Sequence, residues 1–189
     1  MSNFAYKKED FSILINKSKQ GDIKALEEII KRIQKNVYGM FCYLADSSQD
    51  ISDLTQEALI KMAKGIAALK EPEHFKSWLN HIVTNIFYDY SRKHKDDPQV
   101  IRDSEKLLEI KDQIGCEPGE RCLFSEMDKL IRAALLDLPE SLRIVIVLRE
   151  YEGLSYEDIS KITNTSLGTV KSRIARARAK LQDGLKEFI

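Results

Sequence analysis

Apolar residues recur every three or four positions along most of this chain, which is the pattern of helices that bury one face. The pattern runs through residues 13–33, 54–69, 75–90, 130–136 and 142–151. No alternating apolar and polar run of useful length, as a half-buried strand would need, appears in the sequence. The sequence therefore predicts an all-α fold.

The helical pattern stops between residues 94 and 125. An Asp-Pro pair and the run GCEPG form turns readily, and apolar residues are sparse. Eight acidic and five basic side chains make the stretch negatively charged. We interpret it as a flexible linker with one short helix near 103–111. The linker joins two small helical domains, which are expected at 1–93 and 126–189.

Two short helices joined by a tight turn are predicted within residues 155–180. Ser155 and Asp158 have the spacing of a capping box, and Ser166 can cap a second helix that begins at Leu167. Asn164 lies in the connection, and asparagine tolerates the left-handed backbone that such a turn requires. This arrangement is the helix-turn-helix, whose second helix enters the major groove of DNA.

The residues of the second helix separate into two faces when they are placed at about 100° intervals. One stripe is apolar and is expected to pack inward: Leu167, Val170, Ile174, Ala177 and Leu181. The opposite side has small, hydroxyl and arginine side chains and no acid, a set that suits base edges and phosphates. The candidate DNA contacts of this helix are Gly168, Thr169, Lys171, Ser172, Arg173, Arg176, Arg178 and Lys180.

The distribution of charge supports this interpretation. The chain has 30 basic and 30 acidic side chains, but residues 161–189 hold seven basic and two acidic ones. A basic end is the electrostatic pattern of a nucleic-acid contact. A basic helix taken alone is more often a solvated surface. The capped helix before it, the turn and the acid-free outward face favour DNA binding.

At this point the sequence resembles a known family. The stretch LPESLRIVIVLREYEGLSYEDISKITNTSLGTVKSRIARARAKL is similar to region 4 of bacterial sigma factors, especially the extracytoplasmic-function (ECF) group of the sigma-70 family. The matching motifs are Leu138-Pro139, 153–159, 168–173 and Arg178-Ala179. Ser160 stands where alanine is common and Asn164 where glycine is common. The resemblance implies that the second helix contacts the promoter −35 element.

A second motif resembles sigma region 2.2. The segment DISDLTQEALIKMAKGI contains an Asp-Leu-x-Gln-Glu core, and the candidate residues are Asp53, Leu54, Gln56 and Glu57. The resemblance implies that they bind the coiled coil of the largest subunit of core RNA polymerase, while region 4 meets the polymerase flap. Taken alone, an acidic helix face of this kind is most often a plain surface.

A third segment, HFKSWLNHIVTNIFYDYSRK, resembles regions 2.3 and 2.4, which melt and read the −10 element. Its expected inner stripe is Phe75, Leu79, Ile82, Ile86 and Tyr90, whereas Asn80, Thr84, Tyr88 and Ser91 are expected to face outward. The candidate −10 contacts are His74, Trp78, Asn80, His81, Thr84, Asn85, Tyr88 and Arg92. A flank with these groups can offer stacking, hydrogen bonds and charge to an unpaired strand. Trp78 fits a stacking role and a core position equally well.

Together these motifs predict an ECF sigma factor that acts in the cytoplasm with core polymerase and promoter DNA, and the family leads us to expect an anti-sigma factor. Three other classes were weighed. A helix-turn-helix regulator would not need the two upstream motifs, and a helical adaptor would bind DNA independently of salt, if at all. An enzyme is disfavoured because no P-loop, catalytic motif or metal spacing occurs, so no cofactor or metal is expected.

Cysteine content and hydropathy complete the sequence-based expectations. Cys42, Cys116 and Cys122 are too few and too irregularly spaced for a disulfide framework or a zinc site. Cys116 and Cys122 are close enough for a redox switch, although inert thiols are the more common case. The start of the sequence lacks the apolar core of a signal peptide, and no window approaches a membrane span, so membrane insertion is not expected.

Overall fold

The computed structural model describes residues 10–94 and 126–186, and every regular element within these ranges is helical. The all-α prediction is therefore confirmed for this part of the chain. The linker helix expected near 103–111, together with Cys116 and Cys122, lies outside the described residues.

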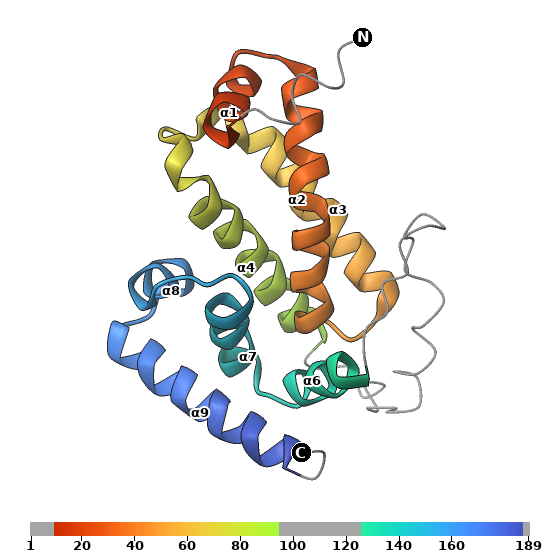
Figure 1. Ribbon diagram of the computed structural model, residues 1–189, viewed down its shortest axis with the longest axis vertical. Helices are drawn as coiled ribbons and strands as arrows, with labels where there is room; N and C mark the ends of the chain where they lie inside the picture. Colours follow the sequence, from red (N-terminus) through yellow and green to blue (C-terminus); the bar gives the residue numbers. More distant parts are fainter. Residues whose placement is uncertain (1–9, 95–125, 187–189) are drawn as a thin grey trace.

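The α-helices of residues 10–94 form a bundle (Figure 1). The helices are α1 (Phe11–Lys19), α2 (Ile23–Leu44), α3 (Ser48–Gly65) and α4 (Phe75–His94), with short 3-10 turns η2 (Ile66–Ala68) and η3 (Pro72–His74) before α4. Polar caps start the first three helices. Asp10 accepts a hydrogen bond from the Ser12 backbone, Asp22 caps α2 and Ser47 caps α3.

Residues 126–186 contain four α-helices and one π-helical segment. They are α6 (Glu126–Leu136), α7 (Glu140–Ile146), the π-helical η5 (Val147–Tyr151), α8 (Tyr156–Thr163) and α9 (Leu167–Leu185). Val170, Ile174 and Ala177 of α9 are fully buried, as the apolar stripe predicted, and Leu181 is half-buried. The helix continues beyond residue 180, where the prediction ended it.

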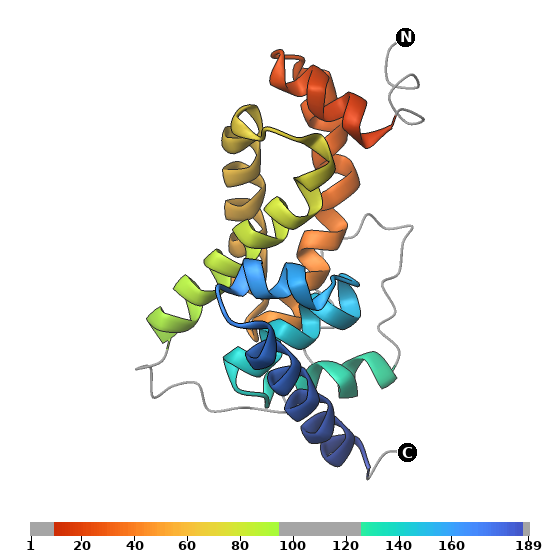
Figure 2. The same cartoon turned by 90° about the vertical axis from the view of Figure 1, so that its left-hand side faces the viewer.

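The two halves pack against each other and share one continuous cluster of buried apolar residues. Figures 1 and 2 show α8 beside α4, while α6 and α7 lie at the end of α2. The linker hypothesis predicted two small domains without placing them in contact. The described structure adds an extensive interface between the halves.

Two arginines of the second half close the C-terminal end of α2. Buried Arg132 of α6 donates from Nε to the Cys42 carbonyl at 2.6 Å and from Nη2 to the Ala45 carbonyl at 3.2 Å. Arg143 of α7 donates to the Leu44 carbonyl at 2.7 Å. The last carbonyls of a helix lack partners within the helix and carry partial negative charge. Cationic donors from the other half therefore fasten the two halves at this point.

Candidate nucleic-acid interface

The helix-turn-helix has the geometry that its sequence predicts. The Ser155 hydroxyl accepts from the Asp158 backbone N–H at 3.0 Å and donates to the Asp158 carboxylate at 2.6 Å. Asn164 takes the left-handed conformation, with φ 49° and ψ 46°. The Ser160 hydroxyl donates to the Thr165 carbonyl at 2.5 Å. The Ser155 cap, the left-handed turn and the two flanking helices are thus confirmed, and the Asp158 carboxylate reaches back to the Ser155 hydroxyl.

The start of α9 presents the basic, acid-free face to solvent. The Ser166 hydroxyl caps the helix by accepting from the Thr169 backbone N–H at 3.1 Å. Gly168, Lys171, Ser172 and Arg176 are exposed, whereas Thr169 and Arg173 are half-buried. A capped helix start with exposed glycine, hydroxyl and arginine side chains can approach a groove closely and donate to bases or phosphates.

Arg178 has a partner that the sequence patterns did not reveal. Its guanidinium donates from Nη2 and Nε to the same Glu150 carboxylate oxygen, at 2.6 and 3.1 Å. The hydrogen bond from Arg178 to Glu150 raises the pKa of the guanidinium further above its usual range. Arg178 and Lys180 are both exposed, but the pairing with η5 leaves Lys180 and Arg176 as the more available cations of this face.

The outward face predicted for α4 is wrong for three of its residues. Asn80, Thr84 and Ser91 are buried, with Asn80 2% and Thr84 0% exposed, and Tyr88 is half-buried. The prediction assumed that one face of α4 is buried against the bundle. In the structure α4 packs against α3 on one side and α8 on the other, so a second stripe is covered as well.

The expected inner stripe of α4 is partly correct. Phe75, Leu79 and Ile86 are buried, while Ile82 and Tyr90 are only half-buried. Val83 and Phe87, which the prediction left out, are fully buried. The buried face of α4 is therefore rotated relative to the predicted one.

The other −10 candidates lie on the open flank of α4. His81 and Asn85 are exposed, and their side chains meet at 2.9 Å. Arg92 is exposed and pairs with Asp89. The half-buried Trp78 ring lies against Phe75, with centroids 5.9 Å apart, and so close to the Gly65 backbone that a Cβ there would collide with it. Trp78 thus combines a packing role with partial exposure.

His74 stands apart from this flank. It lies in η3, before α4 begins, and its Nδ1 is 2.7 Å from the carboxylate of Glu71. Both side chains are exposed, so the contact is a surface pair.

The acidic and amide motif lies on the exposed side of α3. Asp53, Gln56 and Glu57 are exposed, but Leu54 is only 7% exposed and belongs to the core. Leu54 is therefore a packing residue in this structure. Ile60, which follows Gln56 and Glu57 at helical spacing, is 51% exposed and extends the face with an apolar group. Sequence reasoning missed Ile60 because an isolated apolar residue in a helix is expected in the core.

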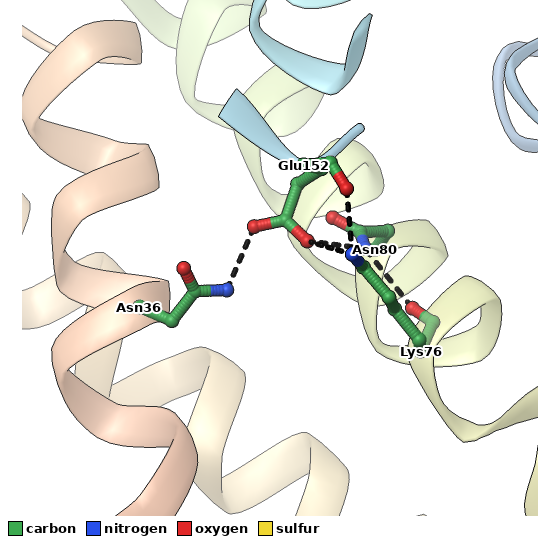
Figure 3. Close-up of polar contacts among 4 residues, drawn as sticks. All are labelled: Asn36, Lys76, Asn80 and Glu152. Atoms are coloured by element: carbon green, nitrogen blue, oxygen red, sulfur yellow. Dashed lines mark hydrogen bonds and ion pairs between the residues drawn. The ribbon is translucent and has the colours of Figure 1, made fainter. Parts of the chain in front are cut away.

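A polar cluster joins the halves where no motif predicted one (Figure 3). Glu152, 5% exposed, follows η5 and points between α2 and α4. Its carboxylate accepts from Asn36 Nδ2 at 2.7 Å and from Asn80 Nδ2 at 3.2 Å. Lys76 donates from Nζ to the Glu152 backbone carbonyl at 2.6 Å. These residues are far apart in the chain, so no local sequence pattern connects them.

Within 10–94 and 126–186, none of the helices combines the length and the apolar character that crossing a bilayer requires. The same residues contain no cluster of histidine, cysteine and carboxylate side chains suited to a metal ion. Cys42 is buried and is not part of a disulfide.

A helical bundle followed by a basic helix-turn-helix defines a DNA-binding protein of the transcription apparatus, and comparisons identify its family. Residues 29–96 match the model for sigma-70 region 2, and residues 128–181 match the model for sigma-70 region 4. The ECF RNA polymerase sigma-E factor of Haemophilus influenzae is 33% identical over 186 residues, which cover 93% of this chain and 95% of that protein. The chain therefore belongs to the ECF group of the sigma-70 family, the transcription initiation factors that direct RNA polymerase to promoters.

Solved structures agree with this fold. The chain is similar to the sigma factor RpoE in its complex with the anti-sigma factor NepR from Bartonella quintana, with a TM-score of 0.63 and 26% identity; the match covers 86% of this chain and 98% of that one. It is also similar in fold to CnrH in complex with the cytosolic domain of CnrY, with a TM-score of 0.67 and 21% identity, covering 94% and 97% of the two chains.

Proposed function

We propose that this sigma factor reads the −35 element with α9, captures the melted −10 strand with the flank of α4, and docks on core polymerase through α3. The exposed, acid-free start of α9 is the observation that carries the proposal. Four residues of this helix start are exposed to solvent: Gly168, Lys171, Ser172 and Arg176. This set combines close approach with cationic and hydroxyl donors, which base and phosphate recognition both need.

The −10 surface consists of two groups of residues. His81, Asn85 and Arg92 are exposed on α4, and Trp78 is half-buried beside them. An aromatic ring, amide donors and a cation along one flank suit an unpaired strand, because every base offers a face for stacking. Asn80, Thr84 and Tyr88 form the second group, which the second half of the chain covers in this structure.

The surface proposed for core polymerase is the face of α3 made by Asp53, Gln56, Glu57 and Ile60. It combines two carboxylates and an amide with one exposed apolar side chain. Interfaces are commonly built with an apolar contact inside a polar rim, so this face suits a basic partner helix. Polymerase as the partner would place the working protein in the cytoplasm.

An anti-sigma factor is the proposed regulator. The support is the resemblance to RpoE, whose structure was solved in complex with the anti-sigma factor NepR. A protein that covers both the α9 face and the α4 flank would prevent promoter recognition without changing either surface.

The test is reconstitution with purified core RNA polymerase. The chain should co-purify with core polymerase and give initiation from a promoter found by mapping transcription starts after overexpression. The chain alone should bind duplex DNA weakly. Failure to bind core polymerase, with sequence-specific binding by the free chain, would instead identify a helix-turn-helix regulator.

The role of Arg176 is tested in the same system. Arg176→Ala should cost about 1–3 kcal/mol of promoter affinity at one base pair if the side chain reads a base. Lys161→Ala removes an exposed cation from α8, outside the proposed contacts, and serves as the control. Competition between promoters that differ at single positions measures the effect. An equal loss on every sequence would make Arg176 a phosphate contact.

A further inference from the structure

Glu152 is a buried carboxylate held by residues of the opposite half. Asn36 of α2 and Asn80 of α4 donate to its two oxygens, and Lys76 adds an ion pair at 3.5 Å. A carboxylate removed from water is tolerated only where donors replace its hydration. These donors belong to α2 and α4, so the Glu152 environment exists only while the halves are together.

The same contact covers one stripe of α4. Asn80 binds Glu152, and Tyr88 lies within the electrostatic reach of Arg173 in α9 and Glu140 in α7. Thr84 stands four residues from each along the helix, so it lies between them on the same face. It is fully buried. The stripe of Asn80, Thr84 and Tyr88 thus faces the second half, where a separated α4 would present it to solvent.

Two polar atoms on this stripe are poorly accommodated. Oδ1 of Asn80 and Oγ1 of Thr84 are buried without a hydrogen-bond partner among the described residues. Such atoms favour water or another polar partner over a covered position. Beside Asn80, Tyr151 and Glu152 border a cavity of about 520 Å³ whose other lining residues, Phe11 and Lys76 among them, belong to the first half. The interface is therefore fastened at defined points and imperfectly filled between them.

Close packing of Tyr151 against α2 provides a further fastening point. The space of a Cβ at Gly39, in the C-terminal part of α2, is occupied by the Tyr151 hydroxyl. The Tyr151 ring also lies 5.3 Å from that of Tyr43, in an edge-to-face arrangement. Tyr151 ends η5 and Glu152 follows it directly, so one short segment contributes both the aromatic and the charged contact.

We propose that the chain on its own is self-inhibited: Glu152 latches the second half onto α4 and covers the stripe of Asn80, Thr84 and Tyr88, which single-stranded DNA contacts after the halves separate. We call the contacts of Glu152 with Asn36, Lys76 and Asn80 the latch. The latch rests on the structure alone, whereas the role of the stripe in DNA binding rests on the proposed function. Opening breaks the Glu152 contacts and exposes the two polar atoms that lack partners in the closed form.

The test places a like charge opposite Glu152. Asn36 is exposed, so Asn36→Asp adds a carboxylate at the latch without disturbing the core. Gln34→Glu, at an exposed position about 200° around the same helix, adds an equal charge away from Glu152 and is the control. Thr84→Cys reports opening through its rate of alkylation by iodoacetamide, with the modified site identified by mass spectrometry. Ala58→Cys, buried in α3, reports unfolding of the first half.

Alkylation at position 84 should accelerate about tenfold or more in Asn36→Asp, because facing like charges are strongly disfavoured across an interface. The rate at position 58 should not change, and Gln34→Glu should behave as the parent. Adding Glu152→Gln to Asn36→Asp should restore protection, since the new amide can donate to the new carboxylate. Equal rates for Asn36→Asp and Gln34→Glu would overturn the latch.

Two further measurements separate the possible failures. Small-angle scattering needs no added cysteine, and a larger radius of gyration for Asn36→Asp than for Gln34→Glu is expected; equal radii would overturn the latch.

Run-off transcription with core polymerase tests the function. Half-maximal transcription should need less Asn36→Asp than parent protein, and an unchanged requirement would overturn self-inhibition. If the parent protein gives no transcription while the latch mutants behave as expected, the proposed function fails and the latch stands.

Discussion

Arg178 and Glu150 show how one residue pair can set the charge of the DNA-binding face. Their side chains are both more than half exposed, so the pair contributes little to folding stability. Its effect on the DNA binding proposed for α9 should be larger, because Glu150 pairs with a cation that the proposal makes available to a phosphate. Glu150 lies 28 residues from Arg178, and its side chain reaches the basic face because α7, which directly precedes η5, packs against α9.

Replacing Glu150 by glutamine should release Arg178. We expect the polymerase complex to bind the promoter more tightly. The slope of log binding constant against log salt concentration should become steeper by about one, because one more phosphate is neutralised. Glu27→Gln, an equivalent change at an exposed position of α2, is the control. Titrations at several salt concentrations measure the slope, and an unchanged slope would show that Arg178 does not reach a phosphate.

Tyr151 links the interface to alkaline pH. Burial, followed by the neighbouring Tyr43 and Glu152, raises its pKa from 10.0 to about 12. The folded state therefore holds the phenol proton more tightly than the unfolded chain. This contribution to stability is complete below about pH 10 and is lost as pH rises through about 12. The melting temperature of the natural protein should fall more between pH 9 and 12 than that of Tyr151→Phe. Parallel curves would exclude Tyr151 as a cause.

The two ends of helix α2 obtain their hydrogen-bond partners in different ways. A neighbouring residue caps its start, whereas a residue from the other half of the chain caps its end. Asp22 caps the first turn from the preceding position. At the other end, Arg132 reaches the carbonyls of Cys42, Ala45 and Asp46. Burial lowers the pKa of Arg132 below its usual range, yet a guanidinium stays charged under ordinary conditions.

Arg132→Met should leave these buried carbonyls without donors and cost about 1.5–3 kcal/mol of unfolding free energy. Arg132→Lys should recover only part of the loss, because an ammonium cannot reproduce the fork of a guanidinium. Urea denaturation measures both changes. Full recovery by lysine would indicate that charge alone, and not the geometry of the donors, stabilises the end of α2.

At the scale of the whole molecule, the sequence predicted the individual helices and their caps well. It did not predict how the two halves pack against each other. The caps at Ser155 and Ser166 and the turn at Asn164 depend on neighbours within a few residues, so local patterns contain them. The buried position of Asn80 involves Glu152, 72 residues further along the chain. A helix between two partners buries two stripes, and periodicity alone identifies the apolar one. Polar residues of the second stripe then resemble a solvent-facing surface.

The shared core also predicts how the molecule unfolds. Calorimetry of the natural protein should show one cooperative transition, because the buried cluster is continuous through both halves. Asn36→Asp should separate this into two transitions, since each half would then melt without the other. A single unchanged transition in Asn36→Asp would mean that the halves are held together by contacts other than those of Glu152.

Gly39 gives this interface a consequence for protein engineering. A glycine inside an exposed helix costs about 1 kcal/mol relative to alanine, so routine optimisation of α2 would replace it. The new methyl group would occupy the space of the Tyr151 hydroxyl. A variant selected for a more stable helix would thus favour the separated state of the protein. If the halves separate as proposed, such a variant would gain activity while its melting temperature falls, so a screen for thermostability alone would discard it.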